Sequence, residues 1–198
     1  MLVHGAGSGP WIWSGWEDAF PGMIVSPVDL LSRRDVGGAS MWDYVATIYE
    51  AAEVLPTPLA LCGWSMGGLL VAMAAATLRP EAVVMIEPSP PAEVRGEDHD
   101  VPLERGTYDP EEVYGPFPPG TAPRPESTLA RGERRRGISV PSLPCRSLVV
   151  GGRRFGEERG RRVAELYGSE HVEFPDLDHF DLVLDPRVPP VVARFLAG

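Results

Sequence analysis

The sequence predicts an α/β domain built on a mostly parallel sheet of about six strands. Residues 59–70 (LALCGWSMGGLL) form an apolar run, a glycine-rich turn and the start of a long apolar helical pattern, which together indicate a strand-turn-helix unit. Residues 82–86 are continuously apolar and β-rich, as expected of a strand buried on both faces of a parallel sheet. With 198 residues and 43% hydrophobic content, the chain is long enough for one domain, 1–198, with a single core.

The first elements can be assigned from local patterns. Residues 2–7 predict a strand that runs directly into a glycine-rich loop, and a first helix is expected to carry Trp11, Trp13 and Trp16. A strand is predicted at 23–28. A helix is predicted at 40–54, with Ser40 as its N-cap and Asp43 three residues later.

The later elements alternate between strands and helices. The helix after the glycine-rich turn is expected to end at Arg79, because Pro80 cannot continue it. Strands are predicted at 147–150 and 171–174, and helices at 157–167 and 188–196.

The turn at 63–67 carries the strongest chemical signal. Gly63-Trp64-Ser65-Met66-Gly67 fits the G-x-S-x-G nucleophile elbow, in which a strained turn lifts a serine above the edge of a sheet. Glycines are needed where a Cβ would collide with the neighbouring strand or the incoming helix. Ser65 then lies at a helix N-terminus, where free N–H groups stabilise a developing oxyanion.

Three motifs together resemble the α/β-hydrolase superfamily: LVHGAGSGPWIW at the start, GWSMGG in the middle and DHF at 178–180. The resemblance covers nearly the whole chain and implies that Ser65 is the nucleophile and His179 the general base. It also implies that the backbone N–H groups of Ala6 and Met66 form the oxyanion hole. His4 is interpreted as a structural histidine that braces the oxyanion loop. The family usually has two strands before this loop, so we expect a sheet that is shorter at one edge, without those N-terminal strands.

Residues 88–141 differ in character from the rest of the chain. They contain half of the 22 prolines amid short charged runs. Because relatives place a cap at this point, the segment is interpreted as a small proline-rich lid inserted into the domain, with one helix near 125–136. Apart from Tyr108, Tyr114 and Phe117, few residues are expected to anchor it.

The triad acid is the uncertain member. Most relatives carry an aspartate after the strand at 147–150, but this chain has Gly-Gly-Arg-Arg-Phe at 151–155. A minority of the superfamily, including many haloalkane dehalogenases, places the acid after the strand that follows the nucleophile helix, where Glu87 stands here. A carboxylate at the end of a buried strand needs a partner, and His179 would supply one. Glu157 is the other candidate, and Asp178 or Asp181 remain alternatives.

Composition limits the partners. The net charge of −10 argues against nucleic acid or an anionic membrane as a partner. The basic run of Arg131, Arg134, Arg135 and Arg136 is interpreted as a solvated face. Neither a transmembrane span nor a signal peptide is recognisable, so a cytoplasmic location is expected. No metal or organic cofactor is expected, and the oligomeric state stays open.

Together these features predict a serine hydrolase that cleaves a small or medium apolar ester, thioester or lactone through an acyl-enzyme. Trp11, Trp13, Trp64 and Phe180 are expected to surround Ser65 with apolar surface. Two alternatives remain. The superfamily also contains lyases and cyclases that use the same triad, and non-catalytic ligand receptors.

Overall fold

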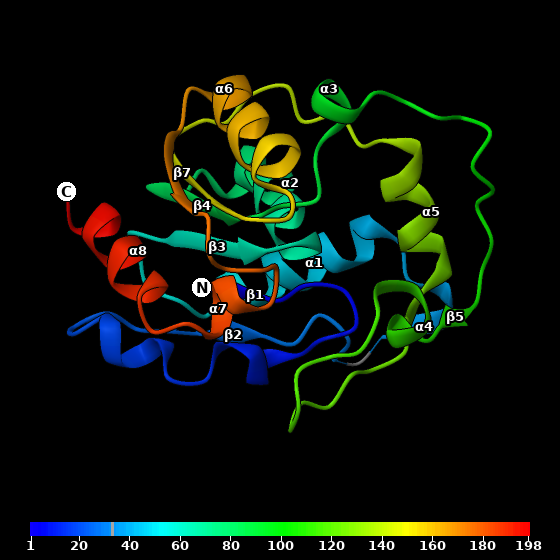
Figure 1. Ribbon diagram of the computed structural model, residues 1–198, viewed down its shortest axis with the longest axis horizontal. Coiled ribbons are helices and arrows are strands. Elements are labelled where there is room, and N and C mark those ends of the chain that lie inside the picture. The colour runs from blue at the N-terminus through cyan, green and yellow to red at the C-terminus, as the bar shows by residue number, and fades with distance from the viewer. Residues whose placement is uncertain (33) are drawn as a thin grey trace.

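The structure is a computed structural model that describes residues 1–32 and 34–198. Its centre is a six-stranded, fully parallel sheet with the strand order β2-β1-β3-β4-β7-β8 (Figure 1). This confirms the predicted sheet. The strands are β1 (Leu2–Val3), β2 (Pro27–Val28), β3 (Ala60–Trp64), β4 (Ala82–Ile86), β7 (Arg146–Gly152) and β8 (Glu170–Phe174).

Alternate side chains of the strands enter two separate hydrophobic clusters, one on each face of the sheet. On β4, Val83 and Met85 belong to one cluster, whereas Val84 and Ile86 belong to the other. This alternation explains why the sequence of β4 is apolar without interruption, because both of its faces are covered.

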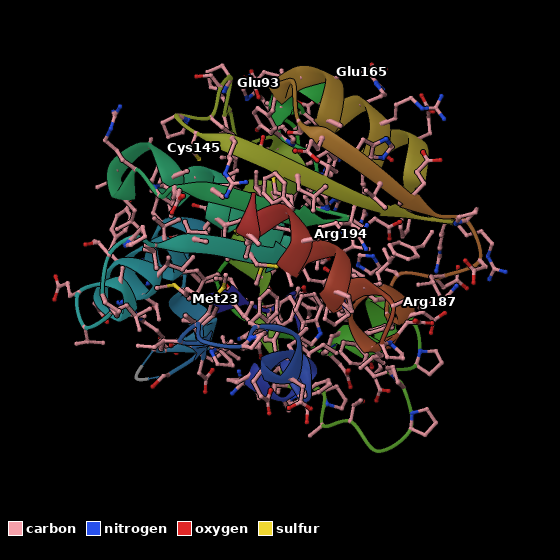
Figure 2. All side chains as sticks on the ribbon, turned by 90° about the vertical axis from the view of Figure 1, so that its left-hand side faces the viewer. Met23, Glu93, Cys145, Glu165, Arg187 and Arg194 are labelled. Carbon is pink, nitrogen blue, oxygen red and sulfur yellow. The ribbon has the colours of Figure 1, made fainter. Side chains whose placement is uncertain are left out.

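Helices cover both faces. The first cluster includes side chains of α1 (Met41–Ala52), α2 (Met66–Leu78) and α6 (Arg162–Tyr167). The second includes side chains of η1 (Pro10–Trp13), η2 (Trp16–Ala19), α7 (Asp181–Leu184) and α8 (Val188–Ala197). In Figure 2, α8 crosses the front of the sheet and carries Arg194. No described helix is long and apolar enough to span a bilayer.

Two helix boundaries agree with their sequence signals. Ser40 and Asp43 form a reciprocal capping box at the start of α1, as predicted. After α2, Arg79 adopts a left-handed conformation with φ 45° and is followed by Pro80. The chain therefore leaves the helix where the sequence indicates.

Residues 88–141 contain several short elements, which are α3 (Ala92–Arg95), β5 (Thr107–Tyr108), α4 (Pro110–Tyr114), β6 (Glu126–Ser127) and α5 (Thr128–Arg136). In Figure 1, β5, α4 and α5 lie beside one end of the sheet, and α8 lies beside the other. α5 fits the predicted helix. The expectation of few anchors is wrong, because Glu133 of α5 accepts a 2.6 Å hydrogen bond from the N–H of Met41, and Gly106 N–H donates to Gly37 O at 2.8 Å in η3 (Val36–Gly38).

Two predicted elements are wrong in extent or type. The strand expected at 23–28 contains only Pro27–Val28, because its partner β1 is two residues long and pairs with these two alone. Met23 and Ile24 lie outside the sheet, with 47% and 67% exposure. The tryptophan-rich helix is two 3₁₀ turns, which are separated at Gly15 with φ 81°. A left-handed residue cannot lie within a continuous α-helix, and glycine adopts this conformation without strain.

The helix predicted at 157–167 begins differently from the expectation. Its first part is a π-helical segment, η4 (Gly156–Arg161), and only α6 is α-helical. A short helix not expected from the sequence, α7, follows His179. Cys62 and Cys145 are both free thiols.

Candidate active site

Ser65 occupies a strained turn between β3 and α2. Its φ of 57° and ψ of −118° are unusual for a residue with a Cβ, and such strain persists only where the surroundings hold it. The Ser65 N–H donates to Ile86 O at 3.0 Å, and its carbonyl oxygen accepts from Ser89 N–H at 2.8 Å. The turn is therefore fixed to the end of β4 on both sides of the Ser65 side chain.

Two glycines make this turn possible. A Cβ on Gly63 would lie 2.1 Å from the carbonyl oxygen of Gly67, and a Cβ on Gly67 would lie 2.2 Å from the carbonyl oxygen of Val3. Both contacts are with backbone, which cannot rotate away as a flexible side chain can. The steric reason inferred from the sequence therefore holds, and the turn brings the N-terminus of α2 against β1.

Two backbone N–H groups, those of Ala6 and Met66, lie near Ser65. Met66 is the first residue of α2, and Ala6 lines the same cavity as Ser65. Neither N–H donates a hydrogen bond within the described part of the chain. The structure thus leaves two donors available where the resemblance expects an oxyanion hole.

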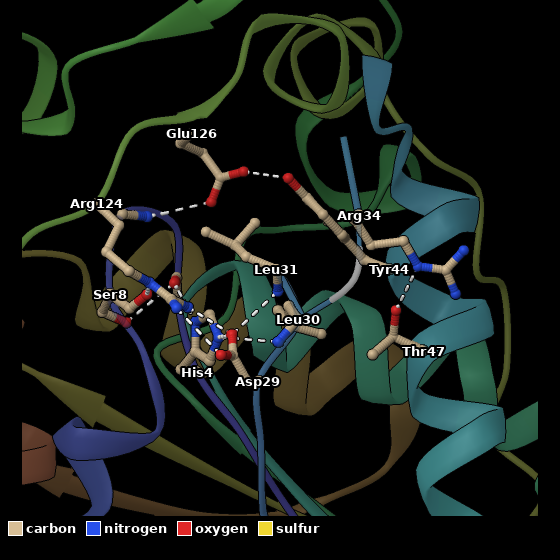
Figure 3. A network of polar contacts seen from close by, with 12 residues as sticks. His4, Ser8, Asp29, Leu30, Leu31, Arg34, Tyr44, Thr47, Arg124 and Glu126 are labelled. Atoms are coloured by element: carbon tan, nitrogen blue, oxygen red, sulfur yellow. Dashed lines mark hydrogen bonds and ion pairs between the residues drawn. The ribbon is translucent and has the colours of Figure 1, made fainter. Parts of the chain in front are cut away.

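The loop that carries Ala6 is held by the segment from 124 to 127 (Figure 3). Glu126 is fully buried, accepts from Gly7 N–H at 3.2 Å and accepts the hydroxyl of Tyr44. Arg124 donates to Ser8 O at 3.2 Å and forms two hydrogen bonds with Asp29, at 2.6 and 3.1 Å. Residues far apart in the sequence therefore brace the loop.

His4 also belongs to this brace. Its Nδ1 lies 2.8 Å from Gly5 O, and its Nε2 accepts from Leu30 N–H at 3.2 Å, which places the proton on Nδ1. The ring is fully buried, and burial lowers the pKa of His4 to about 4. A neutral imidazole with both nitrogens bonded agrees with the structural interpretation of this residue.

Glu87 and His179 meet at the carboxyl end of the sheet. The Nδ1 of His179 lies 2.5 Å from Oε2 of Glu87, and the other carboxylate oxygen accepts from Gly152 N–H at 3.0 Å. Glu87 is 0% exposed and has a φ of 39°. Both oxygens of this buried carboxylate are therefore hydrogen-bonded, as a buried charge requires.

Aromatic rings and cations surround His179. The indole N–H of Trp64 donates to His179 O at 3.0 Å, and the two rings are 4.8 Å apart. Burial lowers the pKa of His179, and although Glu87 raises it, the nearby Arg159 and Arg154 lower it further. The imidazole is thus held in its neutral form, which is the form that a general base needs.

The other carboxylates considered from the sequence lie elsewhere. Glu157 is exposed and forms an ion pair with Arg161 at 3.1 Å. Asp178 pairs with Arg153 at 2.5 Å, and Asp181 accepts the backbone N–H of Asp178. Among the described residues, Glu87 alone hydrogen-bonds the His179 ring through a carboxylate.

Ser65 and His179 line one cavity of about 470 Å³, which is ample for a small organic ligand. Trp64 and Phe180 line it as predicted, together with Phe117 and Phe155. The hydroxyl of Ser65 makes no hydrogen bond to any described residue, so the Ser65–His179 hydrogen bond is not formed in this structure. Such contacts often tighten only when a substrate binds.

The expected positions of Trp11 and Trp13 are wrong. Trp13 is 1% exposed and packs edge to face against Trp16 in the hydrophobic core, with ring centres 4.8 Å apart. Trp11 packs at the border of the same cluster. Neither lines the cavity. Both residues belong to η1, which directs Trp13 into the core on this face of the sheet.

Three arginines that the sequence did not predict near Ser65 line the same cavity, namely Arg134, Arg154 and Arg159. Arg134 contradicts the interpretation of its basic run as a solvated face, because it is 8% exposed. Helical spacing offered one signal: Arg134 lies one turn after Ala130, which is also buried.

Known structures were compared with this one. ClbQ from the colibactin NRPS/PKS pathway is 16% identical, with a TM-score of 0.71 over 99% of this chain and 95% of that one. The methylesterase MES16 from Arabidopsis is 20% identical, with a TM-score of 0.70 over 99% and 98%. RedJ thioesterase from the prodiginine biosynthetic pathway in Streptomyces coelicolor is 19% identical, with a TM-score of 0.64 over 98% and 87%.

A scan against family models and a search of curated protein sequences found no match. At the identities above, structural likeness establishes the fold. The chain has the α/β-hydrolase fold, as the sequence motifs indicated.

Proposed function

We propose that this protein is a serine hydrolase that cleaves a small or medium ester, thioester or lactone through an acyl-enzyme. The observation that carries the proposal is the buried Glu87–His179 pair, which opens on the same cavity as the strained Ser65. Names of structurally similar proteins, such as the methylesterase and the thioesterase above, support a hydrolase of this kind.

In the proposed reaction, Ser65 Oγ attacks the substrate carbonyl while Nε2 of His179 removes the hydroxyl proton. The N–H groups of Ala6 and Met66 hydrogen-bond the oxyanion of the tetrahedral intermediate. The protonated imidazole then gives its proton to the leaving group, and the acyl-enzyme forms. A water molecule, activated by the same histidine, attacks the ester of Ser65 and releases the acid.

Glu87 has two tasks in this scheme. Its Oε2 accepts the Nδ1–H of His179, which leaves Nε2 free to accept a proton. Its negative charge stabilises the imidazolium that forms in each half of the reaction. Gly152 N–H holds the second oxygen and so keeps the carboxylate in this orientation.

The variant Ser65→Ala tests the proposal with p-nitrophenyl acetate and butyrate as neutral substrates. We expect loss of hydrolysis by several orders of magnitude, together with loss of labelling by a fluorophosphonate probe. Ser14→Ala, at an exposed serine, is the matched control and should keep both. Undiminished hydrolysis by Ser65→Ala would overturn the mechanism.

Two further measurements separate the alternative functions. A folded wild-type protein that the fluorophosphonate does not label would indicate a non-catalytic ligand receptor. Incorporation of labelled oxygen from water into the acid product is expected for a hydrolase. A labelled serine with turnover but without such incorporation would indicate a lyase or cyclase.

A further inference from the structure

The cavity beside Ser65 has a basic wall as well as aromatic rings. Arg134 comes from α5, and Arg154 and Arg159 come from the segment that follows β7. These residues are distant in sequence and converge on one space. The net charge of the whole chain, −10, gives no hint of this local excess of positive charge.

Arg134 is buried without an adequate partner. Its side chain has five N–H donors, yet its only hydrogen bond to a described side chain is a long one, 3.5 Å, to the hydroxyl of Tyr114. Its Nε is buried and has no partner in the described part of the chain. A guanidinium in this position loses its hydration, and the protein returns few hydrogen bonds to it.

Arg159 is in a similar state. Its Nε is also buried without a partner among the described residues, and its guanidinium lies 4.0 Å from the ring centre of Phe155. Burial lowers the pKa of Arg159, and the positive charge of Arg134 lowers it further. The ion pairs that described arginines form involve Arg34, Arg124, Arg153, Arg161 and Arg187, not these two.

The acidic groups that face these arginines are already engaged. Glu126 accepts hydrogen bonds on both of its oxygens, and so does Glu87. Glu158 is exposed. At the cavity wall, Asp178 is paired with Arg153, and Asp181 accepts a backbone N–H. Within the described part of the chain, the Nε donors of Arg134 and Arg159 are therefore left without a partner.

We propose that Arg134 and Arg159 bind an anionic group, a carboxylate or a phosphate, which the substrate carries in addition to its scissile ester. The guanidinium fork matches both groups in shape and charge. The inference rests on the proposed function and specifies its substrate class. The aromatic rings of Phe117, Phe155 and Phe180 would contact the apolar part between the two ends.

Two matched pairs of substrates test the inference and locate the charge. Monomethyl adipate against methyl hexanoate places a carboxylate on the acyl side. The butyryl ester of glycerol 3-phosphate against monobutyrin places a phosphate on the alcohol side. We expect the wild type to prefer the charged member of at least one pair in kcat/KM.

The variant Arg134→Met should lower kcat/KM for the preferred charged ester by about 10- to 150-fold, as loss of a hydrogen bond to a charged group predicts. The effect should lie mainly in KM and should be much smaller for the neutral member. Arg159→Met should act in the same direction. Arg135→Met, at the exposed neighbour, is the matched control and should change neither substrate.

A third measurement does not depend on any variant folding. Adipate or inorganic phosphate should competitively inhibit hydrolysis of methyl hexanoate by the wild type, whereas neutral adipamide should not. Equal rates for both members of both pairs, without inhibition by either anion, would overturn the inference. So would an equal loss on charged and neutral esters in a folded Arg134→Met.

The outcome also separates this inference from the function on which it rests. Hydrolysis of the neutral esters that disappears in Ser65→Ala, with no preference for anions, leaves the hydrolase standing and removes the anion site. Hydrolysis that survives in Ser65→Ala removes the proposed mechanism itself.

Discussion

Replacing Glu87 by glutamine tests the assignment of the triad acid with almost no change in shape. In the structure, one carboxylate oxygen accepts Gly152 N–H at 3.0 Å, and the other lies 2.5 Å from Nδ1 of His179. A glutamine can satisfy Gly152 only with its carbonyl oxygen, so its NH₂ group must face the imidazole. Nδ1 then has to accept rather than donate, and the proton moves to Nε2.

That tautomer cannot take the proton of Ser65, and the amide provides no charge to stabilise an imidazolium. The same kind of change in a serine protease triad lowers kcat by about 10⁴, which corresponds to about 5.4 kcal/mol in activation free energy. We expect a loss of this order for Glu87→Gln. Initial rates with p-nitrophenyl butyrate measure it, and thermal unfolding followed by circular dichroism checks that the variant folds.

Glu157→Gln is the matched control, because Glu157 is an exposed glutamate paired with Arg161 and should be nearly silent. A folded Glu87→Gln with a kcat within about tenfold of the wild type would refute the assignment. Inactivity of Glu157→Gln in its place would move the acid to the segment after β7.

Two further predictions concern the base and the oxyanion loop. Burial lowers the pKa of His179 below its ordinary 6.5, so its neutral form persists on acidification. The acid limb of the kcat/KM profile should therefore have its midpoint below pH 6.5. A midpoint above that value would contradict the environment described for the ring. Arg124→Ala removes the contacts that brace the loop of Ala6, so kcat should fall by up to about 10² while the free energy of unfolding changes by about 1 kcal/mol or less, since the ion pair is partly exposed. Initial rates measure kcat, and urea unfolding measures the free energy of unfolding. The control is Arg187→Ala, at an exposed arginine with two acidic partners, which should leave kcat unchanged. An equal loss of kcat in both variants would argue against a specific brace.

The parts of the fold and site that depend on local pattern could be predicted from the sequence. The bounds of β4 and the capping box of α1 follow from a few consecutive residues, and both agree with the structure. The turn at Ser65 could be located because it needs glycine at 63 and 67, where a Cβ would lie 2.1 and 2.2 Å from backbone oxygens. The contact of Glu87 with His179 could be predicted because a carboxylate at the end of a buried strand requires a partner.

Features that depend on contacts between distant segments could not be predicted. Glu126 reads as one acidic residue in a proline-rich stretch, yet it is buried against Tyr44, 82 residues away. Arg134 reads as part of a basic helix face, and only the position of α5 beside the cavity buries it. Trp13 could be recognised as apolar, but the residues around it do not indicate whether its side chain faces the core or the cavity.

The position of Glu87 explains the glycine at residue 152. Glu87 N–H donates to Val150 O at 2.7 Å, so its carboxylate extends across the end of β7. A Cβ at Gly152 would lie 3.1 Å from that carboxylate and 2.8 Å from Leu177 O, which accounts for the glycine at this position. Glu87 occupies the place beside Nδ1 of His179, so in the proposed mechanism the segment after β7 needs no acid of its own. The same segment carries Arg154 and Arg159, which line the cavity beside Ser65.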